Sequence, residues 1–209
     1  MRELYLECYS GISGDMTVAA LLDLGVPGEY LMKELEKLHL DGYEIKISRT
    51  KKNQITATDF DVILKDEHKE EHGHEHVHTH VNDEDVKECH EQEHSQEHTH
   101  VHNSYREIKE FILASELSDK VKEMILKIFQ AIAEAEAQVH GTAVDEVHFH
   151  EVGAVDSIVD ISAAAICLDY LGFDSIVTSE IWEGKGHVWC QHGRIPVPAP
   201  AVLAIFSKS

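Results

Sequence analysis

The stretch around which this chain is built is His148-Phe149-His150-Glu151-Val152-Gly153-Ala154-Val155-Asp156-Ser157-Ile158-Val159-Asp160. It places two imidazoles and three carboxylates within 13 residues. His148 and His150 are two positions apart, so on a strand both side chains point to the same side. Gly153 ends that strand, and the apolar run from Val155 to Leu171 predicts a buried helix.

The polar side chains of this stretch suit a divalent metal and an anionic ligand. Asp156 and Asp160 are four positions apart and share one helical face near the helix N-terminus. Two histidines before a tight turn and two aspartates after it can form a cradle for both ligands. The alternative is structural: aspartates cap a helix start and interact favourably with its dipole, and a histidine pair often lies on the surface. The residue types alone support both interpretations.

The composition restricts the class of partner. The chain has 209 residues, 39 acidic against 18 basic side chains and a net charge of −21. Nucleic acids and anionic membranes require clustered basic residues, so neither is an expected partner. We find no signal peptide and no uncharged apolar run long enough to cross a membrane, which predicts a cytoplasmic protein. The four cysteines form no C-x-x-C pair, as expected in a reducing compartment.

A glycine-rich loop lies near the N-terminus. Alternation from Glu3 to Tyr9 predicts a strand, and Thr17 to Leu24 predicts a helix. The loop between them is Ser10-Gly11-Ile12-Ser13-Gly14-Asp15-Met16. Its glycines let the backbone approach a ligand, and the helix N-terminus offers N–H groups to an anion. The loop is not a P-loop, because it lacks Gly-Lys-Ser/Thr, and a tight turn with Ser13 or Asp15 as N-cap is the favoured structural alternative.

The remaining pattern predicts an α/β domain, with a mixed sheet of about five to seven strands, packed helices and one insertion. Residues 1–64 and 104–209 form this domain. Further helices are predicted at Pro27–Leu38, from Tyr105 to Ile112 and from the N-cap Ser118 to His140, and further strands at Tyr43–Arg49, Ile55–Leu64 and Ser175–Trp182. The turn between the second and third strands falls at Lys51–Gln54. The side chains expected to face the core on this hairpin are Tyr43, Ile45, Ile47, Phe60, Val62 and Leu64.

Residues 65–103 differ in composition from the rest of the chain. They hold 11 of the 17 histidines and 12 acidic residues, with almost no large apolar side chains. We therefore predict a disordered, His-rich, metal-binding insertion, because no core can form there. Neutral imidazole suits Ni²⁺, Cu²⁺ or Zn²⁺, so binding is expected to fail below about pH 5.5. The alternative is a solvated linker. The histidines are His68, His72, His74, His76, His78, His80, His90, His94, His98, His100 and His102.

The C-terminal region is marked by prolines. Pro196, Pro198 and Pro200 are two positions apart, which favours an extended segment and excludes a helix or a central strand there. A helix begins near Val202, and the chain stops one turn later at Ser209. We expect the polypeptide to continue in its natural form.

Three motifs resemble one family. Ser10–Met16, His148–Asp160 and the segment from His192-Gly193 to Pro196-Val197-Pro198-Ala199-Pro200-Ala201 are similar, in this order, to the nickel-insertion proteins of the lactate racemase maturation system (LarC). The resemblance extends over nearly the whole chain, including a His-rich insertion. It implies insertion of nickel into a pyridinium bis-thiocarboxylate mononucleotide, giving a nickel-pincer nucleotide with a nickel–carbon bond. It also implies CTP hydrolysis, with Mg²⁺ or Mn²⁺ bound by a C-terminal region that this chain lacks.

The resemblance supplies a substrate for the candidate site. We assign the phosphate to Ser10, Gly11, Ser13, Gly14 and Asp15. We assign nickel to His148, His150, Asp156 and Asp160, in addition to the tract histidines His72, His74, His76, His78, His80, His98, His100 and His102. Glu151 or His192 is the expected base for the proton released when the ring C–H becomes C–Ni.

Two other functions are compatible with the residues. One is nickel storage or delivery through the His-rich tract. The other is a metal-dependent phosphohydrolase that uses Asp15, Asp156 and Asp160. The expected partners are the mononucleotide, a separately encoded C-terminal part and further copies of the chain.

Overall fold

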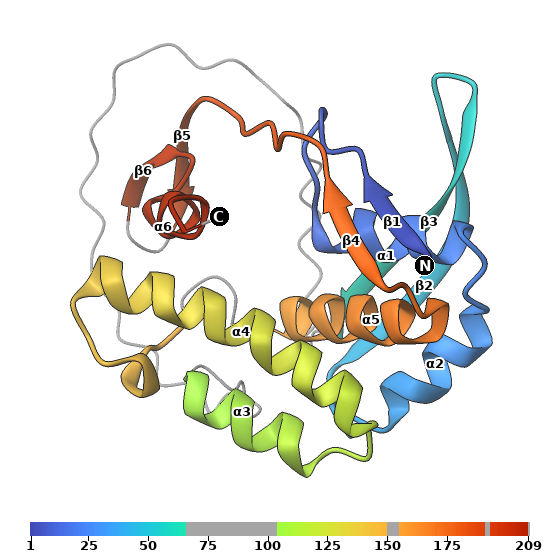
Figure 1. The fold of residues 1–209 in the computed structure, drawn as a ribbon, viewed down its shortest axis with the longest axis horizontal. Helices are drawn as coiled ribbons and strands as arrows, with labels where there is room; N and C mark the ends of the chain where they lie inside the picture. The colour runs from blue at the N-terminus through green and yellow to red at the C-terminus, as the bar shows by residue number, and fades with distance from the viewer. Residues whose placement is uncertain (66–103, 150–154, 191–192, 209) are drawn as a thin grey trace, which may run out of the picture.

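A computed structural model describes residues 1–65, 104–149, 155–190 and 193–208 (Figure 1). Within these ranges the chain forms an α/β fold whose elements follow one another as β1 (Glu3–Leu6), α1 (Gly14–Asp23), α2 (Gly28–Glu36), β2 (Tyr43–Lys52), β3 (Ile55–Leu64), α3 (Tyr105–Ala114), α4 (Asp119–His140), the 3-10 turn η1 (Val144–Glu146), α5 (Val155–Leu171), β4 (Ser175–Thr178), β5 (Gly186–Cys190), β6 (Gly193–Val197) and α6 (Pro200–Phe206).

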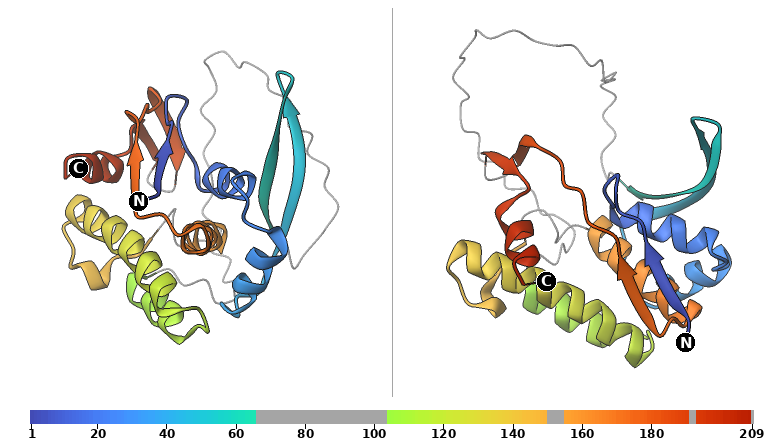
Figure 2. Two further views of the ribbon diagram at one scale, coloured as in Figure 1. Left: turned by 45° about the vertical axis from the view of Figure 1, so that its right-hand side comes forward. Right: turned by 45° about the horizontal axis from the view of Figure 1, so that its top comes forward.

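The strands differ from the predicted arrangement. Six strands are described, but they form three separate two-stranded sheets instead of one mixed sheet. β1 pairs with β4 in parallel, whereas β2–β3 and β5–β6 are antiparallel hairpins. Figure 2 shows α1 lying between the β1–β4 pair and the long β2–β3 hairpin. The periodicity identified the strands but could not report their neighbours, because pairing depends on contacts between distant segments.

The β2–β3 hairpin confirms its predicted position and shows a tighter turn. The pairing runs from Tyr43–Leu64 to Lys52–Ile55, so Asn53 and Gln54 alone make the turn. Both have positive φ angles, 49° and 69°, which matches the twist of a two-residue hairpin. Phe60 is buried as expected, but Ile47 and Leu64 are exposed.

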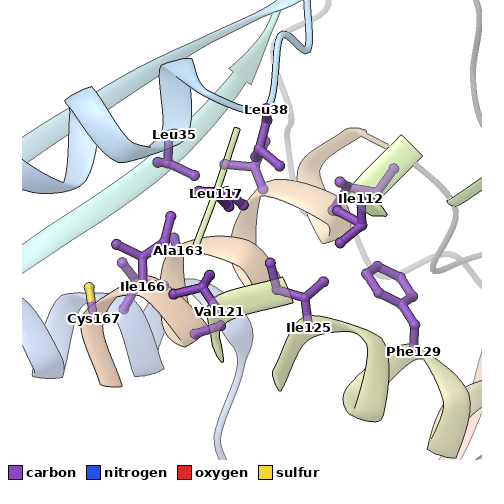
Figure 3. Packing of buried hydrophobic residues seen from close by; sticks show 14 of the residues in the cluster. Leu35, Leu38, Ile112, Leu117, Val121, Ile125, Phe129, Ala163, Ile166 and Cys167 are labelled. Carbon is purple, nitrogen blue, oxygen red and sulfur yellow. The ribbon is translucent and has the colours of Figure 1, made fainter. Parts of the chain in front are cut away.

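Helix α5 is the centre of the core. Its predicted bounds are confirmed, and its buried residues cover most of its circumference. α1, α2 and α4 pack against it, so residues from both sides of the insertion share one core. Figure 3 shows Ile125 and Val121 of α4 facing Ala163 and Ile166 of α5.

The helix ends follow local sequence signals. The Ser104 hydroxyl accepts a hydrogen bond from the Glu107 N–H, and the Glu107 carboxylate accepts one from the Ser104 N–H, forming a capping box. Ser118 caps α4 as predicted. Gly141 ends α4 in the left-handed conformation, at a φ of 68° that a residue with a Cβ rarely adopts.

Several predicted boundaries move. β1 ends at Leu6 instead of Tyr9 and α1 begins at Gly14 instead of Thr17, so the loop between them moves toward the N-terminus and keeps its predicted length. β4 ends at Thr178 instead of Trp182, because the chain leaves the β1–β4 sheet at Ser179. As for membranes, the helices that the structure describes include none with the length and apolarity needed to cross a bilayer.

Candidate functional site

The glycine-rich loop brings α1 against α5. Ser13 is the N-cap of α1, but its side chain makes no capping hydrogen bond. Its carbonyl accepts a hydrogen bond from the Thr17 hydroxyl at 2.7 Å. A Cβ at Gly14 would lie 2.8 Å from the Cβ of Asp160, closer than side chains approach one another. Gly14 is therefore required for this helix contact, which places Asp160 beside the first turn of α1.

Asp160 is the most perturbed acid of the described site. It is partly buried, and its Oδ1 atom is buried with no hydrogen-bond partner among the described residues. Burial, followed by the negative charges of Asp15 and Asp156 in that order, raises the pKa of Asp160 to about 6. The backbone N–H of Asp15 acts in the opposite direction by donating to the carboxylate.

A small hollow opens beside this carboxylate. Its volume is about 240 Å³, and its walls come from the loop, α1, α4 and α5. The lining residues are Ile12, Ser13, Gly14, Thr17, Ile128, Asp160, Ile161 and Ala164. Mostly apolar walls with one unpartnered carboxylate oxygen suit a cation or a proton donor, because either would compensate the buried charge.

Asp156 lies at the surface, in the first turn of α5. Its Oδ1 atom accepts a hydrogen bond from the Ser157 N–H at 2.7 Å. At this position the carboxylate also interacts favourably with the helix dipole, which is the structural role considered for Asp156 above. Because Asp156 contributes to the raised pKa of Asp160, the two carboxylates share one local field.

His148 does not lie on a strand, contrary to the prediction. It forms an isolated antiparallel bridge with Ser104 and is exposed. Phe149 is 5% exposed and packs against the rings of Tyr105 and Phe129, with centroid distances of 6.5 and 6.1 Å. The bridge and this apolar anchor therefore hold the segment, and the imidazole of His148 stays open to solvent.

Several predicted site residues lie outside the described residues. They are His150, Glu151, His192 and the tract histidines His72, His74, His76, His78, His80, His98, His100 and His102. Within the described ranges, no three His, Cys, Asp or Glu side chains converge closely enough to hold one metal ion. Asp15, Asp156 and Asp160 therefore interact electrostatically without enclosing a metal.

Sequence reasoning missed a pair of aromatic side chains beside the loop. Tyr9 and Trp182 contact one another edge to face, with centroids 6.3 Å apart and planes at 87°. Trp182 was predicted only as the end of a strand. Its position in a glycine-rich, charged segment was the available signal, since tryptophan is seldom left exposed without a partner.

The described residues thus bring the carboxylates of Asp15, Asp156 and Asp160 together near the N-terminal turns of α1 and α5. The chain matches the nickel insertion protein family over residues 4–209, and it belongs to that family. The predicted family is thus confirmed.

Three curated relatives are named "Pyridinium-3,5-bisthiocarboxylic acid mononucleotide nickel insertion protein". The relative from Clostridium acetobutylicum is 55% identical over 210 residues, covering 100% of this chain and 50% of the relative. The one from Alkaliphilus metalliredigens is 52% identical, covering 98% and 45%. The one from Clostridium kluyveri is 50% identical, covering 100% and 47%. The chain therefore spans about half the length of these relatives. No solved structure matches it.

Proposed function

We propose that this chain takes part in nickel insertion into the pyridinium bis-thiocarboxylate mononucleotide. In this reaction a ring carbon loses a proton and uses the freed electron pair to bind Ni²⁺, while the two thiocarboxylate sulfurs complete the pincer. The metal is a substrate, so its site must release it, and a site with open coordination positions is suitable.

The observation that carries this proposal is the environment of Asp160. A partly buried carboxylate with one unpartnered oxygen faces a hollow and lies near two further carboxylates. A divalent cation would reduce the repulsion among the three acids. We propose that the carboxylates of Asp160 and Asp156 attract Ni²⁺ without enclosing it, until the thiocarboxylate sulfurs take the ion, and that His148 and His150 remain proposed nickel ligands.

Glu151 and His192 remain proposed bases for the proton of the ring carbon, and Asp160 is a third. A carboxyl group with a pKa near 6 is ionised at neutral pH and accepts a proton readily. Once nickel moves to the sulfurs, the freed carboxylate of Asp160 can take up the proton from the ring. This sequence uses one side chain first as a metal ligand and then as a proton acceptor.

In this proposal only the first part of the glycine-rich loop binds the phosphate of the mononucleotide. Gly14 and Asp15 contact Asp160, so an anion there would meet a carboxylate. We therefore assign the phosphate to the earlier residues Ser10, Gly11 and Ser13.

We place the reaction in the cytoplasm, where thiols are reduced. Burial raises the pKa of the Cys167 thiol to about 12 and makes it unreactive.

The folded nickel site and the His-rich tract should be separable. We expect a variant with the eleven tract histidines replaced by asparagine to lose most low-affinity nickel binding and to keep one tighter site. In that background His148→Ala should weaken the remaining site about tenfold or more, because an imidazole ligand is removed. Isothermal titration with Ni²⁺ measures both changes.

His39→Ala is the matched control, since His39 is also exposed and its Nε2 atom lies 3.5 Å from the Glu116 carboxylate. Loss of all nickel binding with the tract would instead support storage or delivery. Phosphate release from simple nucleotides without nickel would support a phosphohydrolase.

We further propose that the second half of the longer relatives completes the β1–β4 sheet. This parallel pair is small, with four residues in each strand. Parallel sheets in proteins normally have both faces covered by other elements. The Leu6 carbonyl accepts the Ser179 N–H at 2.9 Å, so the backbone groups of Tyr5 and Glu7, which alternate with it, point away from β4.

A groove of about 430 Å³ follows this free edge of β1. It is lined by Leu4, Leu6 and Ile12 and by Met16, Ala20 and Leu24 of the α1 region, among others. Leu24 is 54% exposed. An added strand would bond to the edge and place alternate apolar side chains in the groove. In this proposal CTP hydrolysis, with Mg²⁺ or Mn²⁺, belongs to the second half.

The docking surface can be tested with charge substitutions. We expect the second half of the Clostridium acetobutylicum relative, added as a separate polypeptide, to bind the chain. Ala20→Lys combined with Leu24→Lys should weaken that binding about tenfold or more, because two long charged side chains would obstruct a mostly apolar groove, whose lining also includes Glu7 and Asp23. Leu113→Lys is the control, since Leu113 is 52% exposed on α3.

Analytical ultracentrifugation and biolayer interferometry would provide the measurements. Equal binding by the double variant and the control would contradict the proposal. Self-association of the chain that the double variant abolishes would assign the groove to a second copy instead.

A further inference from the structure

We propose that Trp182 and Tyr9 form a stacking platform for a cationic aromatic ring, the pyridinium of the mononucleotide. This inference rests on the proposed function for its ligand and on separate residues for its evidence. The two rings contact one another edge to face, and they remain 61% and 51% exposed. Aromatic side chains of this size normally bury most of their surface, so an ordered, exposed pair indicates a ligand or partner.

The platform is held to the glycine-rich loop by backbone contacts. The Cys8 carbonyl accepts the N–H groups of Gly11 at 3.1 Å and Trp182 at 3.4 Å. The Cys8 N–H donates to the Ser179 hydroxyl at 2.8 Å in a buried contact. One end of the loop is thus joined to the segment that carries Trp182, and the other end, Gly14, packs against Asp160. A ligand bound along the loop can reach both.

The surroundings of Trp182 have the chemistry for such a ligand. An open hollow of about 650 Å³ is lined by Trp182, Ile181 and Phe206, with Glu180, Glu183 and Lys185. Two carboxylates favour a positive ring, and the ammonium group of Lys185 can bind a thiocarboxylate or phosphate of the same molecule. Among aromatic side chains, tryptophan attracts cations most strongly through the negative face of its ring.

The charge distribution therefore favours a pyridinium over a neutral base. A pyrimidine or purine would stack on tryptophan but would gain nothing from Glu180 and Glu183. A pyridinium ring is permanently positive, so it gains both stacking and electrostatic attraction. Ring recognition at Trp182 would orient the mononucleotide, while Asp160 acts on the metal and the proton. Trp182 is in this sense a positioning residue.

Two mononucleotides separate ring charge from phosphate binding. Nicotinamide mononucleotide carries a pyridinium ring with an uncharged amide, and uridine monophosphate carries a neutral ring on the same ribose phosphate. We expect the full chain to bind the former about tenfold more tightly in isothermal titration. Trp182→Leu should weaken its binding about 5- to 30-fold, and Trp182→Phe should retain most of it.

The other tryptophan provides the control and the optical probe. Trp189 is 79% exposed on β5, so Trp189→Leu should not change binding. The chain has two tryptophans, so Trp182 is the only one in a Trp189→Phe background. Its fluorescence should be quenched by the pyridinium mononucleotide and not by uridine monophosphate. Thermal melting of each variant checks the fold.

Several results would overturn the platform. They are equal affinity for both mononucleotides, unchanged affinity in Trp182→Leu, and absence of any binding to the intact chain. If nickel insertion still required Asp160 in any of these cases, the proposed function would survive alone. Conversely, Trp182-dependent ring binding by a chain that inserts no nickel would leave the platform and remove the proposed function.

Discussion

Replacing Asp160 by asparagine should abolish nickel insertion and at the same time make the fold more stable. The wild-type carboxylate is partly buried, its Oδ1 atom has no partner in the part of the chain that the structure describes, and it lies near Asp15 and Asp156. Asparagine has nearly the same shape and removes the charge. It keeps an oxygen that can accept the Asp15 N–H. The variant therefore loses both proposed roles, metal ligand and proton acceptor, without leaving a cavity.

The size of the stability gain follows from linkage. The pKa of Asp160 rises from an ordinary value of 3.8 to about 6, which corresponds to about 3 kcal/mol at 1.36 kcal/mol per unit. Because the side chain is only partly buried, solvent screening reduces this, and we expect a gain of about 1–2 kcal/mol at pH 7.5. We expect nickel insertion to fall at least about 100-fold, as for the loss of a catalytic acid–base group.

The gain should depend on pH in a defined direction. The folded protein binds this proton more tightly than the unfolded chain, so the contribution of Asp160 to stability falls as the pH rises. The free energies of unfolding of wild type and Asp160→Asn should differ least below about pH 4. The two free energies should diverge between about pH 4 and 6, because in this range the carboxyl group is already ionised in the unfolded chain and still protonated in the folded protein. Urea unfolding at several pH values measures this.

Asp169→Asn is the matched control on the same helix. Asp169 forms an ion pair with Lys120 at 2.7 Å, so its replacement should cost stability, by about 0–1 kcal/mol, and leave nickel insertion intact. An Asp160→Asn protein that is less stable than wild type at pH 7.5, or that inserts nickel normally, would refute this account of the site.

Phe149→Ala should give the largest loss of stability, about 3–5 kcal/mol, and weaken nickel binding with it. Phe149 is almost fully buried and packs against Phe129, which is completely buried, and Tyr105. Its removal leaves a cavity between α3, α4 and the segment that carries His148. The bridge from His148 to Ser104 would then lose its apolar support.

Phe149→Leu separates the two effects. Leucine fills much of the cavity, so this variant should recover most of the stability and hold His148 in place. Leu113→Ala, at an exposed position of α3, should change the free energy of unfolding by less than about 0.5 kcal/mol. Urea unfolding and nickel titration below the unfolding transition provide the readouts. A Phe149→Ala variant that unfolds at the wild-type urea concentration would show that Phe149 does not anchor this segment.

The sequence by itself determined the elements whose signals are local. The apolar run from Val155 to Leu171, the N-cap Ser118 and the end of the helix at His140 are recognised within one or two turns of the chain. Hydrogen bonds of this kind join near neighbours, so their pattern can be read without knowing the fold. The three motifs also identified the family, because long runs of matching residues are specific.

Only the tertiary structure decided which of these elements meet. It brought Gly14 and Asp15 against Asp160, paired Tyr9 with Trp182 and divided the strands into three sheets. The raised pKa of Asp160 results from burial and from charges that are distant in sequence, and neither can be read from local periodicity. The carboxylate of Asp160 acquires its properties because helix packing excludes water around it, and packing is a property of the whole core.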